Sequence, residues 1–340
     1  MFSVKVLSVE DTKKYLKMSE VIDTVENVYK QKAMDKTVVW PLIFYEFDPG
    51  TADMDIKSGW LKGSGIFGLK LVSFFGNNAE KDLPTLVGTV MVMDDKTGAP
   101  LGFLDGGHIT GMRTGAAGAI GAKYLANKNS KNLLIVGSGH IAAFEIAASL
   151  EIFPDLEKVY IYNSLNFNEA KKFAAEIPAR LHNEFGMDEV KASFVPVSDE
   201  ECPAATADSQ IIITVTPSKK PIIKKEWVSP GTHFSCIGAD MSGKEEIDPE
   251  ILAMARVFTD DKPQCINVGE IEIPVKMGIL KTEDIAGEIG QVITREVEGR
   301  QSSDQITVFD ATGIALLDLA TAQLALKKAD AEGQAQTVMI

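Results

Sequence analysis

The sequence predicts an α/β protein of two domains: a Rossmann-type domain with a doubly wound parallel sheet, and an α+β domain. Three observations support this prediction. From residue 131 onward, short apolar segments of strand length alternate with helix-length segments, as in parallel sheets whose strands are joined by helices. A Gly-x-Gly-x-x-Ala segment joins the first of these strands to the first helix. The 340 residues also exceed the size of one ordinary hydrophobic core.

The segment before residue 131 predicts strands followed by a glycine-rich helix. Residues 66–73 (IFGLKLVS) and 86–93 (LVGTVMVM) are rich in apolar and β-branched residues, as strands are. A turn at 94–101 leads into a short strand that ends in FLDGG, and residues 108–126 then form a helix of mainly small residues. Each Gly costs about 1 kcal/mol of helix propensity relative to Ala. We therefore expect this helix to be packed closely on both sides.

The segment after residue 131 predicts the Rossmann-type domain. Its strands are expected at residues 132–137, 159–163, 191–197, 210–216, 233–238, 256–261 and 306–310. Its helices are expected at residues 141–153, 168–185 and 199–207. A last helix, at 313–333, is expected to return to the first domain, and residues 334–340 to form a loosely held tail. The predicted domains are residues 1–126 with 314–340, and residues 127–313.

Composition limits the classes of function. The formal net charge is −14, and so acidic a chain repels phosphate backbones, which disfavours a nucleic-acid partner. No uncharged apolar run reaches roughly 18 residues, so neither a membrane span nor a membrane partner is expected, and residues 1–18 do not resemble a signal peptide. Cys202, Cys236 and Cys265 lack zinc or disulfide spacing. We therefore expect no metal site and a cytoplasmic location.

Gly137-Ser138-Gly139-His140-Ile141-Ala142 fits the pattern of a dinucleotide-binding turn. The first Gly allows the tight turn, the second lets the backbone approach a pyrophosphate, and the helix N-terminus offers free N–H groups to the anion. The alternative is a merely structural connection between strand and helix. The apolar strand before the turn, the helix after it and the second strand at 159–163 favour dinucleotide binding.

The end of the second strand bears on the choice of cofactor. An acid at this position normally holds the ribose 2′-hydroxyl of NAD, but here Asn163 and Ser164 follow the strand. The missing carboxylate slightly favours NADP over NAD, although no arginine follows to bind the 2′-phosphate. The alternative is that Asn163 caps the next helix.

A redox site for a small amino or keto acid needs cations for the carboxylate and a group that moves a proton. Asp240 follows a predicted strand, at the sheet edge where ligands bind, and a carboxylate there could take a proton from a substrate amine. The alternative is a helix cap. Lys70 lies in an otherwise apolar strand, and Arg113 has small neighbours that leave room for a bound carboxylate. Both have the alternative of a surface charge.

Taken together, these motifs resemble the ornithine cyclodeaminase/mu-crystallin family of NAD(P)-dependent enzymes. The resemblance runs from about residue 40 to about residue 325. The stretches that carry it are GLKLVSFFGNN, LPTLVGTVMVMDDKTGAPLGFLDGGHITGMRTGAAGAIGAKYLA, VGSGHIA, IITVTPSKKPI, IGADMSGKEEID and ITVFDATGIALLDLATA.

The resemblance implies roles for individual residues. Lys70 and Arg113 match the family's substrate-carboxylate residues, and Asp240 matches the catalytic aspartate of its amino-acid-oxidising members, which mu-crystallin lacks. With Lys57 and Thr85, the two cations form the predicted substrate-binding set. The predicted cofactor-binding residues outside the glycine turn are Thr114, Asn163, Ser164, Thr214, Val215, Thr216, Ile237, Gly238 and Lys244. The first domain is expected to bind the substrate and to form a homodimer, and the second to bind the dinucleotide.

The chain departs from the family pattern at two places. Members carry an arginine after an early proline, where this chain has Pro41 and Leu42. Ornithine cyclodeaminase also has an acid thirteen residues before the lysine that Lys70 matches, and here that residue is Lys57. A lysine suits the cationic side chain of ornithine poorly. These departures favour an amino acid with a short or acidic side chain.

Three functions follow from this reading. The leading one is an NAD(P)-dependent amino-acid dehydrogenase or imine reductase, in which Asp240 moves the proton and hydride passes between the substrate Cα and the nicotinamide. The second is a cyclodeaminase, which releases ammonia and returns the hydride. The third is a non-catalytic binding protein like mu-crystallin, and the presence of Asp240 argues against it.

Overall fold

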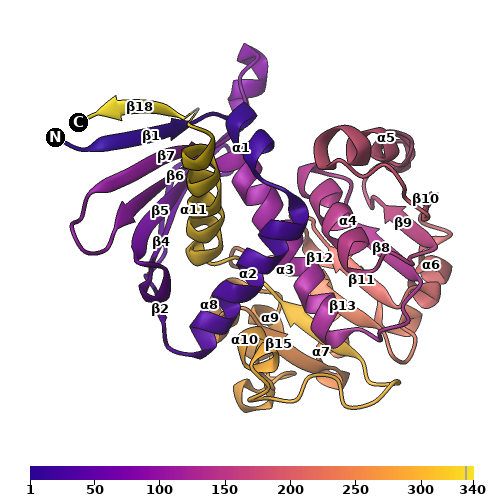
Figure 1. The fold of residues 1–340 in the computed structure, drawn as a ribbon. Helices are drawn as coiled ribbons and strands as arrows, with labels where there is room; N and C mark the ends of the chain where they lie inside the picture. The colour runs from indigo at the N-terminus through magenta and orange to yellow at the C-terminus, as the bar shows by residue number, and fades with distance from the viewer. Residues whose placement is uncertain (334) are drawn as a thin grey trace. The chain divides into compact units, whose positions relative to one another are not determined.

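A computed structural model of the chain describes residues 1–333 and 335–340 and divides it into two compact units (Figure 1). Unit 1 comprises Met1–Arg113 and Ile314–Ile340, and unit 2 comprises Thr114–Gly313. The first boundary thus differs from the predicted one after residue 126. It falls inside helix α3 (Gly106–Leu125), because the second half of this continuous helix packs within unit 2.

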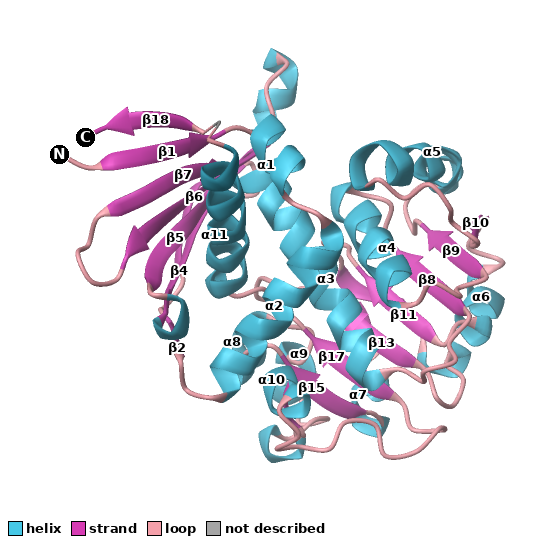
Figure 2. Cartoon of the chain, in the orientation of Figure 1, coloured by secondary structure: helices cyan, strands magenta, loops and turns pink. Residues whose placement is uncertain are grey.

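Unit 1 is built on a mixed sheet of eight strands among the described residues, in the order β18-β1-β7-β6-β5-β4-β2, with β3 paired to β4 (Figure 2). Its strands are β1 (Ser3–Leu7), β2 (Thr37–Val39), β3 (Ile43–Asp48), β4 (Ala52–Leu61), β5 (Ile66–Phe75), β6 (Leu86–Asp94), β7 (Pro100–Asp105) and β18 (Gln336–Met339). Its helices are α1 (Val9–Tyr15), α2 (Met18–Ala33), the first part of α3, α11 (Ala315–Glu332) and the short 3-10 helices η1 (Lys62–Ser64) and η2 (Gly76–Lys81). Helix α11 packs on β4, β5 and β6 and against α2.

The prediction of a loosely held tail was wrong for Gln336–Met339. These residues form β18, which pairs antiparallel with β1 at the other end of the chain. Residue 334, also part of the predicted tail, lies outside the described residues. Backbone hydrogen bonds to β1, and not side-chain burial, hold this strand, because all four of its side chains are exposed.

Unit 2 contains a sheet of eight strands, again counted among the described residues, in the order β10-β9-β8-β11-β13-β17-β15-β16. Every pair in it is parallel. Its strands are β8 (Asn132–Val136), β9 (Lys158–Tyr162), β10 (Ser193–Val197), β11 (Ile211–Thr214), β13 (His233–Cys236), β15 (Arg256–Thr259), β16 (Gly287–Glu288) and β17 (Thr307–Asp310). The predicted doubly wound sheet is confirmed, and its strand order reverses between β8 and β11, which is where ligands bind in such sheets.

The remaining elements of unit 2 connect these strands. The helices are α4 (His140–Ile152), α5 (Phe167–Phe185), α6 (Cys202–Asp208), α7 (Pro249–Met254), α8 (Lys262–Val268), α9 (Glu272–Lys276), α10 (Ile289–Ile293) and the 3-10 helices η3 (Lys225–Trp227) and η4 (Thr282–Asp284). A separate pair, β12 (Lys219–Ile223) and β14 (Glu245–Ile247), is also parallel. In the described part of the chain, no helix is both long and apolar enough to cross a membrane.

The glycines of α3 allow the close packing that the sequence predicts. A Cβ at Gly115 would overlap the backbone of Phe144 in α4, and one at Gly121 would overlap the Phe309 ring in β17. Within unit 2, α3 therefore contacts a helix on one side and the sheet on the other. Each Gly lowers the helix propensity of α3, but it allows the helix to pack this closely against its neighbours.

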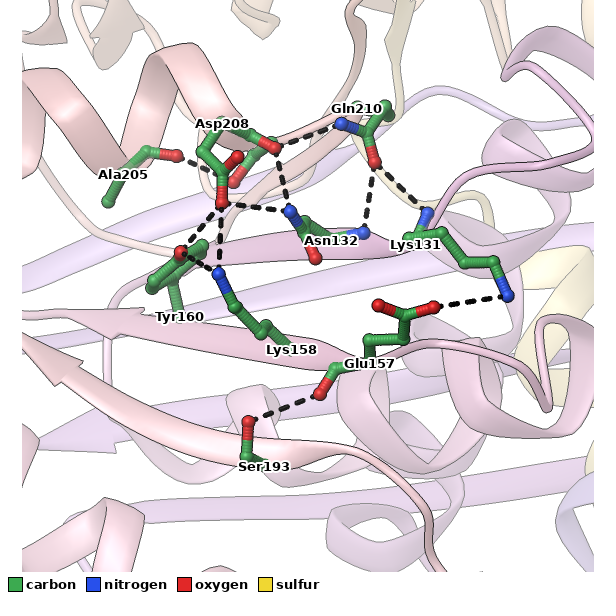
Figure 3. Close-up of polar contacts among 10 residues, drawn as sticks. Lys131, Asn132, Glu157, Lys158, Tyr160, Ser193, Ala205, Asp208 and Gln210 are labelled. Atoms are coloured by element: carbon green, nitrogen blue, oxygen red, sulfur yellow. Dashed lines mark hydrogen bonds and ion pairs between the residues drawn. The ribbon is translucent and has the colours of Figure 1, made fainter.

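A polar network joins the amino ends of three strands of unit 2 (Figure 3). The Asp208 carboxylate accepts hydrogen bonds from Tyr160 Oη at 2.7 Å and Asn132 Nδ2 at 2.8 Å. The Gln210 side chain accepts the backbone N–H groups of Lys131 and Asn132, both at 3.0 Å. These contacts hold together the amino ends of the strands, at the opposite end of the sheet from the carboxyl ends. Candidate ligand contacts therefore belong at the other edge.

Candidate functional site

The glycine turn connects β8 to α4 in the way that dinucleotide binding requires. Gly137 has φ +114°, which a residue with a side chain rarely adopts, and its N–H donates to the Tyr162 carbonyl at 2.7 Å. Gly139 is the N-cap of α4, and a Cβ placed on it would meet nothing within 4 Å. Space therefore remains beside Gly139 at the N-terminus of α4, where backbone N–H groups can bind an anion such as a pyrophosphate.

Asn163 adjoins the glycine turn but does not cap a helix. Its Nδ2 donates to Ser138 Oγ at 2.8 Å, and its Oδ1 accepts the N–H groups of Leu165 and Asn166 at 3.0 Å each. The N-cap of α5 is Asn166, so the alternative reading of Asn163 was wrong. Asn163 instead ties the loop after β9 to the loop after β8, and with Ser164 it lines a cavity of about 290 Å³.

Glu246 connects the two loops that follow β11 and β13. It is fully buried, and it accepts hydrogen bonds from Thr214 Oγ1 at 2.7 Å and from the Gly238 N–H at 2.9 Å. It also accepts the Thr216 N–H at 2.6 Å and the Thr216 hydroxyl at 2.7 Å. Of the predicted cofactor residues, these loops contain Val215, Thr216, Ile237, Gly238 and Lys244. Sequence reasoning missed Glu246. Its carboxylate oxygens accept hydrogen bonds from residues that lie 8 to 32 positions away along the sequence.

Burial sets the protonation behaviour of this carboxylate. It raises the pKa of Glu246 to about 7, against the lowering effect of the hydrogen bonds from Thr214, Thr216 and Gly238. Burial and then the charge of Glu246 raise the pKa of Glu270 well above its ordinary value. The Glu270 carboxylate accepts the backbone N–H groups of Glu246 and Ile247. Glu270 therefore fixes the backbone of β14, the strand that contains Glu246.

Asp240 follows β13 at the carboxyl edge of the sheet and forms an ion pair with Lys244. The Lys244 Nζ donates to Asp240 Oδ1 at 2.6 Å, and 43% of the Asp240 side chain is exposed. The helix-cap reading of Asp240 was wrong, because the next helix, α7, begins at Pro249 with Asp248 as its N-cap. An accessible carboxylate at this edge can exchange a proton with a ligand.

In unit 1, Lys70 and Arg113 converge on one buried carboxylate. The Lys70 Nζ lies 3.0 Å and the Arg113 Nε 3.1 Å from Asp318 Oδ1. The exposed fractions of the three residues are 2%, 7% and 0%, so the surface-charge readings of Lys70 and Arg113 were wrong. Thr110 Oγ1 accepts a further hydrogen bond from Lys70 Nζ at 3.3 Å. Sequence reasoning missed Asp318, although a lone acid in the apolar stretch GIALLDLATA was a signal.

Charge and burial shift the pKa values in this cluster in a consistent way. Burial, and then the positive charge of Arg113, lower the pKa of Lys70 to about 8, while Asp318 acts to raise it. Burial acts to raise the pKa of Asp318, but Arg113 and Lys70 outweigh it and hold that pKa below its ordinary value. With Lys70 protonated, the three groups carry one net positive charge. A net positive charge of this kind favours a further carboxylate nearby.

The other two predicted substrate residues lie at different distances from this cluster. Lys57 is the register partner of Lys70 on β4, and its charge lowers the pKa values of both Lys70 and Asp318. The backbone carbonyl of Thr85 accepts a hydrogen bond from the N–H group of Phe75, the last residue of β5. At about 3.4 Å per strand residue, Phe75 is roughly 17 Å along the strand from Lys70. The structure brings Lys57 to the cluster but not Thr85.

The family follows from a comparison with known proteins. Residues 3–333 match the ornithine cyclodeaminase/mu-crystallin family. The chain belongs to this family. It is 36% identical to alanine dehydrogenase of Archaeoglobus fulgidus, over 95% of this chain and 94% of that protein.

Two solved structures of relatives share the fold over almost their whole length. One is an archaeal alanine dehydrogenase dimer with bound NAD, which is 34% identical, covers 100% of both chains and has a TM-score of 0.89. The other is Δ1-pyrroline-2-carboxylate reductase of Thermococcus litoralis in complex with NADH and L-proline, which is 31% identical, covers 98% of this chain and 100% of the other, and also has a TM-score of 0.89. The expected class, an NAD(P)-dependent oxidoreductase of amino acids or imines, agrees with these relatives. The slight preference for NADP stays a prediction.

Replacing Glu246 by Gln tests whether this carboxylate holds the two cofactor loops. Each Glu246 oxygen accepts a backbone N–H group, so either orientation of the Gln amide sets an NH₂ group against a donor. Loss of one hydrogen bond costs about 0.5–1.5 kcal/mol. We expect the Kd for NAD⁺ to rise about two- to tenfold in isothermal titration calorimetry. Glu250→Gln, on the exposed side of α7, is the control, and an unchanged Kd in Glu246→Gln would contradict the role.

Proposed function

We propose that this protein catalyses reversible hydride transfer between a nicotinamide dinucleotide and the Cα of a small amino acid or its imine. The observation that carries the proposal is Asp240, an accessible carboxylate at the same sheet edge as the glycine turn. Strand β13 is two positions from β8 in the sheet, so about 10 Å separates the strands that lead to the two features. The substrate and dinucleotide classes also agree with those of the relatives.

In the proposed reaction each group has a defined task. The bound dinucleotide supplies or accepts the hydride, and the glycine turn with Thr114, Thr216 and Lys244 contributes to its binding. Lys70 and Arg113 bind the substrate carboxylate by charged hydrogen bonds. Asp240 removes a proton from the substrate amine during oxidation and returns it during reduction. The hydrogen bond from Lys244 Nζ holds the Asp240 carboxylate in position.

The side chain of the substrate separates dehydrogenation from cyclodeamination. A cyclodeaminase must hold a substrate with a second amine, but Lys57 extends from β4 beside Lys70. Its charge repels a cationic side chain, which supports the dehydrogenase or imine reductase over the cyclodeaminase. Product analysis distinguishes them, because a net change in the nicotinamide absorbance accompanies only the first. A mu-crystallin-like protein that only binds its ligand, without catalysis, would not need Asp240 for proton transfer.

Asp240→Asn tests the proton transfer. The amide keeps the shape of the side chain but cannot accept the proton, so we expect kcat to fall by roughly two to four orders of magnitude. The measurement is steady-state oxidation of an amino acid found by screening, followed at the nicotinamide absorbance. Asp284→Asn, at an exposed position in η4, is the matched control. If the Asp240→Asn enzyme works within a factor of two of wild type, the proposed role is wrong.

The pKa of Lys70 predicts how carboxylate binding depends on pH. The pKa is about 8, so Lys70 is charged below pH 8 and loses its proton as the pH rises through that value. Loss of a charged hydrogen bond costs about 1.5–3 kcal/mol. We therefore expect the inhibition constant of a competing simple carboxylic acid to rise about eight- to twenty-fivefold between pH 7 and pH 9.5, because the free protein still holds part of its Lys70 protons within this range. In Lys70→Arg the guanidinium stays charged, and the rise should vanish; the same rise in both proteins would exclude Lys70 as its source.

An exposed apolar strip on unit 1 supports a homodimer. Ile43, Tyr45 and Phe47 alternate along β3, and each has more than half of its surface exposed in the single chain. The Phe47 ring lies 5.7 Å from that of Phe75, which is 40% exposed. A contiguous strip of this kind is typical of an interaction surface, and an archaeal relative is a dimer. We place the dimer in the cytoplasm, where the three buried thiols stay reduced.

Charged substitutions on this strip should separate the two copies. In Tyr45→Lys/Phe47→Lys, association would bury two lysines against apolar side chains, so we expect a monomer in size-exclusion chromatography with light scattering. Met277→Lys changes a 64% exposed apolar residue of unit 2 and should leave the mass of wild type unchanged. A dimer that survives the double substitution at equal concentration would show that the interface lies elsewhere.

A further inference from the structure

A cavity beyond the ends of β9 and β10 collects acidic groups at the edge of the predicted dinucleotide site. It has a volume of about 290 Å³ and lies between the loop after β9, with Asn163 and Ser164, and the loop after β10, with Ser198, Asp199 and Glu200. The two strands are parallel neighbours in the sheet, as Figure 1 shows. Tyr162 pairs with Val197 in register. Asn163 and Ser198 are thus the first residues beyond the sheet on adjacent strands.

Asn163 cannot replace the acid that usually follows the second strand. Its Oδ1 accepts two backbone N–H groups, and its Nδ2 donates to Ser138 Oγ. An amide also presents only one acceptor oxygen. The side chain is therefore committed to holding the loop after β9 against the glycine turn, and the acceptor for ribose hydroxyls must come from another residue.

Asp199 offers such an acceptor in the same cavity. Its Oδ1 accepts a hydrogen bond from Tyr162 Oη at 2.9 Å, and Tyr162 is the last residue of β9. That contact ties the Asp199 carboxylate to the side chain of the last residue of the second strand. An ionised carboxylate has about four acceptor positions, so the contact with Tyr162 leaves acceptor capacity for hydroxyl groups.

We propose that Asp199 and Glu200 make this protein select NAD over NADP. Asp199 replaces the missing acid and accepts hydrogen bonds from the hydroxyl groups of the adenosine ribose. The carboxylates of Asp199 and Glu200 both repel a 2′-phosphate. The inference deepens the proposed function and rests on it, because it concerns the same dinucleotide. It also reverses the slight preference for NADP that the sequence suggested from Asn163 alone. The acid comes from the third strand instead of the second.

One cation, Lys171 of α5, lies beside an aromatic ring that lines this cavity. The Lys171 Nζ lies 4.2 Å from the centroid of the Phe167 ring, which lines the cavity. Its charge also helps to lower the pKa of Glu201, whose carboxylate accepts hydrogen bonds from the N–H and hydroxyl of Ser198. Two further acids, Asp199 and Glu200, line the cavity itself. A phosphate at pH 7 carries about 1.5 to 2 negative charges, and these two carboxylates would repel it.

Direct binding measurements test the proposal without catalysis. Titration calorimetry of the full chain with NAD⁺ and with NADP⁺ should give a Kd for NADP⁺ at least about tenfold higher, corresponding to about 1.4 kcal/mol. Asp199→Asn removes the charge and keeps the size, so its ratio of the two Kd values should fall to about threefold or less. The double variant Asp199→Asn/Glu200→Gln should bind the two cofactors equally.

The control and the contrary outcomes separate this inference from the proposed function. Glu189→Gln makes the same change of charge in the loop before β10, at the opposite end of that strand, and should keep the wild-type ratio. If wild type binds both cofactors with equal affinity, or Asp199→Asn keeps the wild-type ratio, the selectivity proposal is wrong while the proposed function stands. If neither cofactor binds at millimolar concentration, both are wrong. Circular dichroism of each variant verifies that it is folded.

Discussion

Burial of an ionised carboxylate is costly unless the protein compensates its charge, and each unit contains one compensated carboxylate among the residues to which we assign ligand binding. In unit 1, Asp318 of α11 is compensated by two cations, Lys70 and Arg113. In unit 2, Glu246 is compensated by hydrogen-bond donors from the loops after β11 and β13. Both acids hold in place the groups to which we assign ligand binding. Neither needs to touch a ligand to do so.

The two kinds of compensation have opposite consequences for stability as the pH changes. Cations hold the pKa of Asp318 below its ordinary value, so the stability that this group contributes is present above pH 4 and is lost as the pH falls. Donors only partly offset the burial of Glu246, whose pKa is about 7. Its contribution is therefore present at low pH and is lost as the pH rises through about 7.

Sequence reasoning recovered the parts of this protein whose signals are local. The strand, glycine turn and helix around Gly137 were predicted because spacing alone encodes them. The strands β1 to β4 were missed, since mixed pairing and exposed apolar residues such as Tyr45 hide the usual alternation. Asp318 and Glu246 were missed because their roles come from contacts with residues far along the chain, 248 positions in the case of Lys70. Such contacts depend on tertiary structure.

The same distinction between local and global signals applies to charge. A net charge of −14 argues against a nucleic-acid partner, yet the ligands proposed here are also anions. What decides is the field within a few ångströms, because solvent and salt screen more distant charges. The cations around Asp318 favour a carboxylate, and the N-terminus of α4 favours a diphosphate. Asp199 and Glu200 disfavour a further phosphate at the ribose. An acidic chain can thus bind a carboxylate and a diphosphate and still exclude a phosphate at the ribose, because the residues next to each group determine whether it binds.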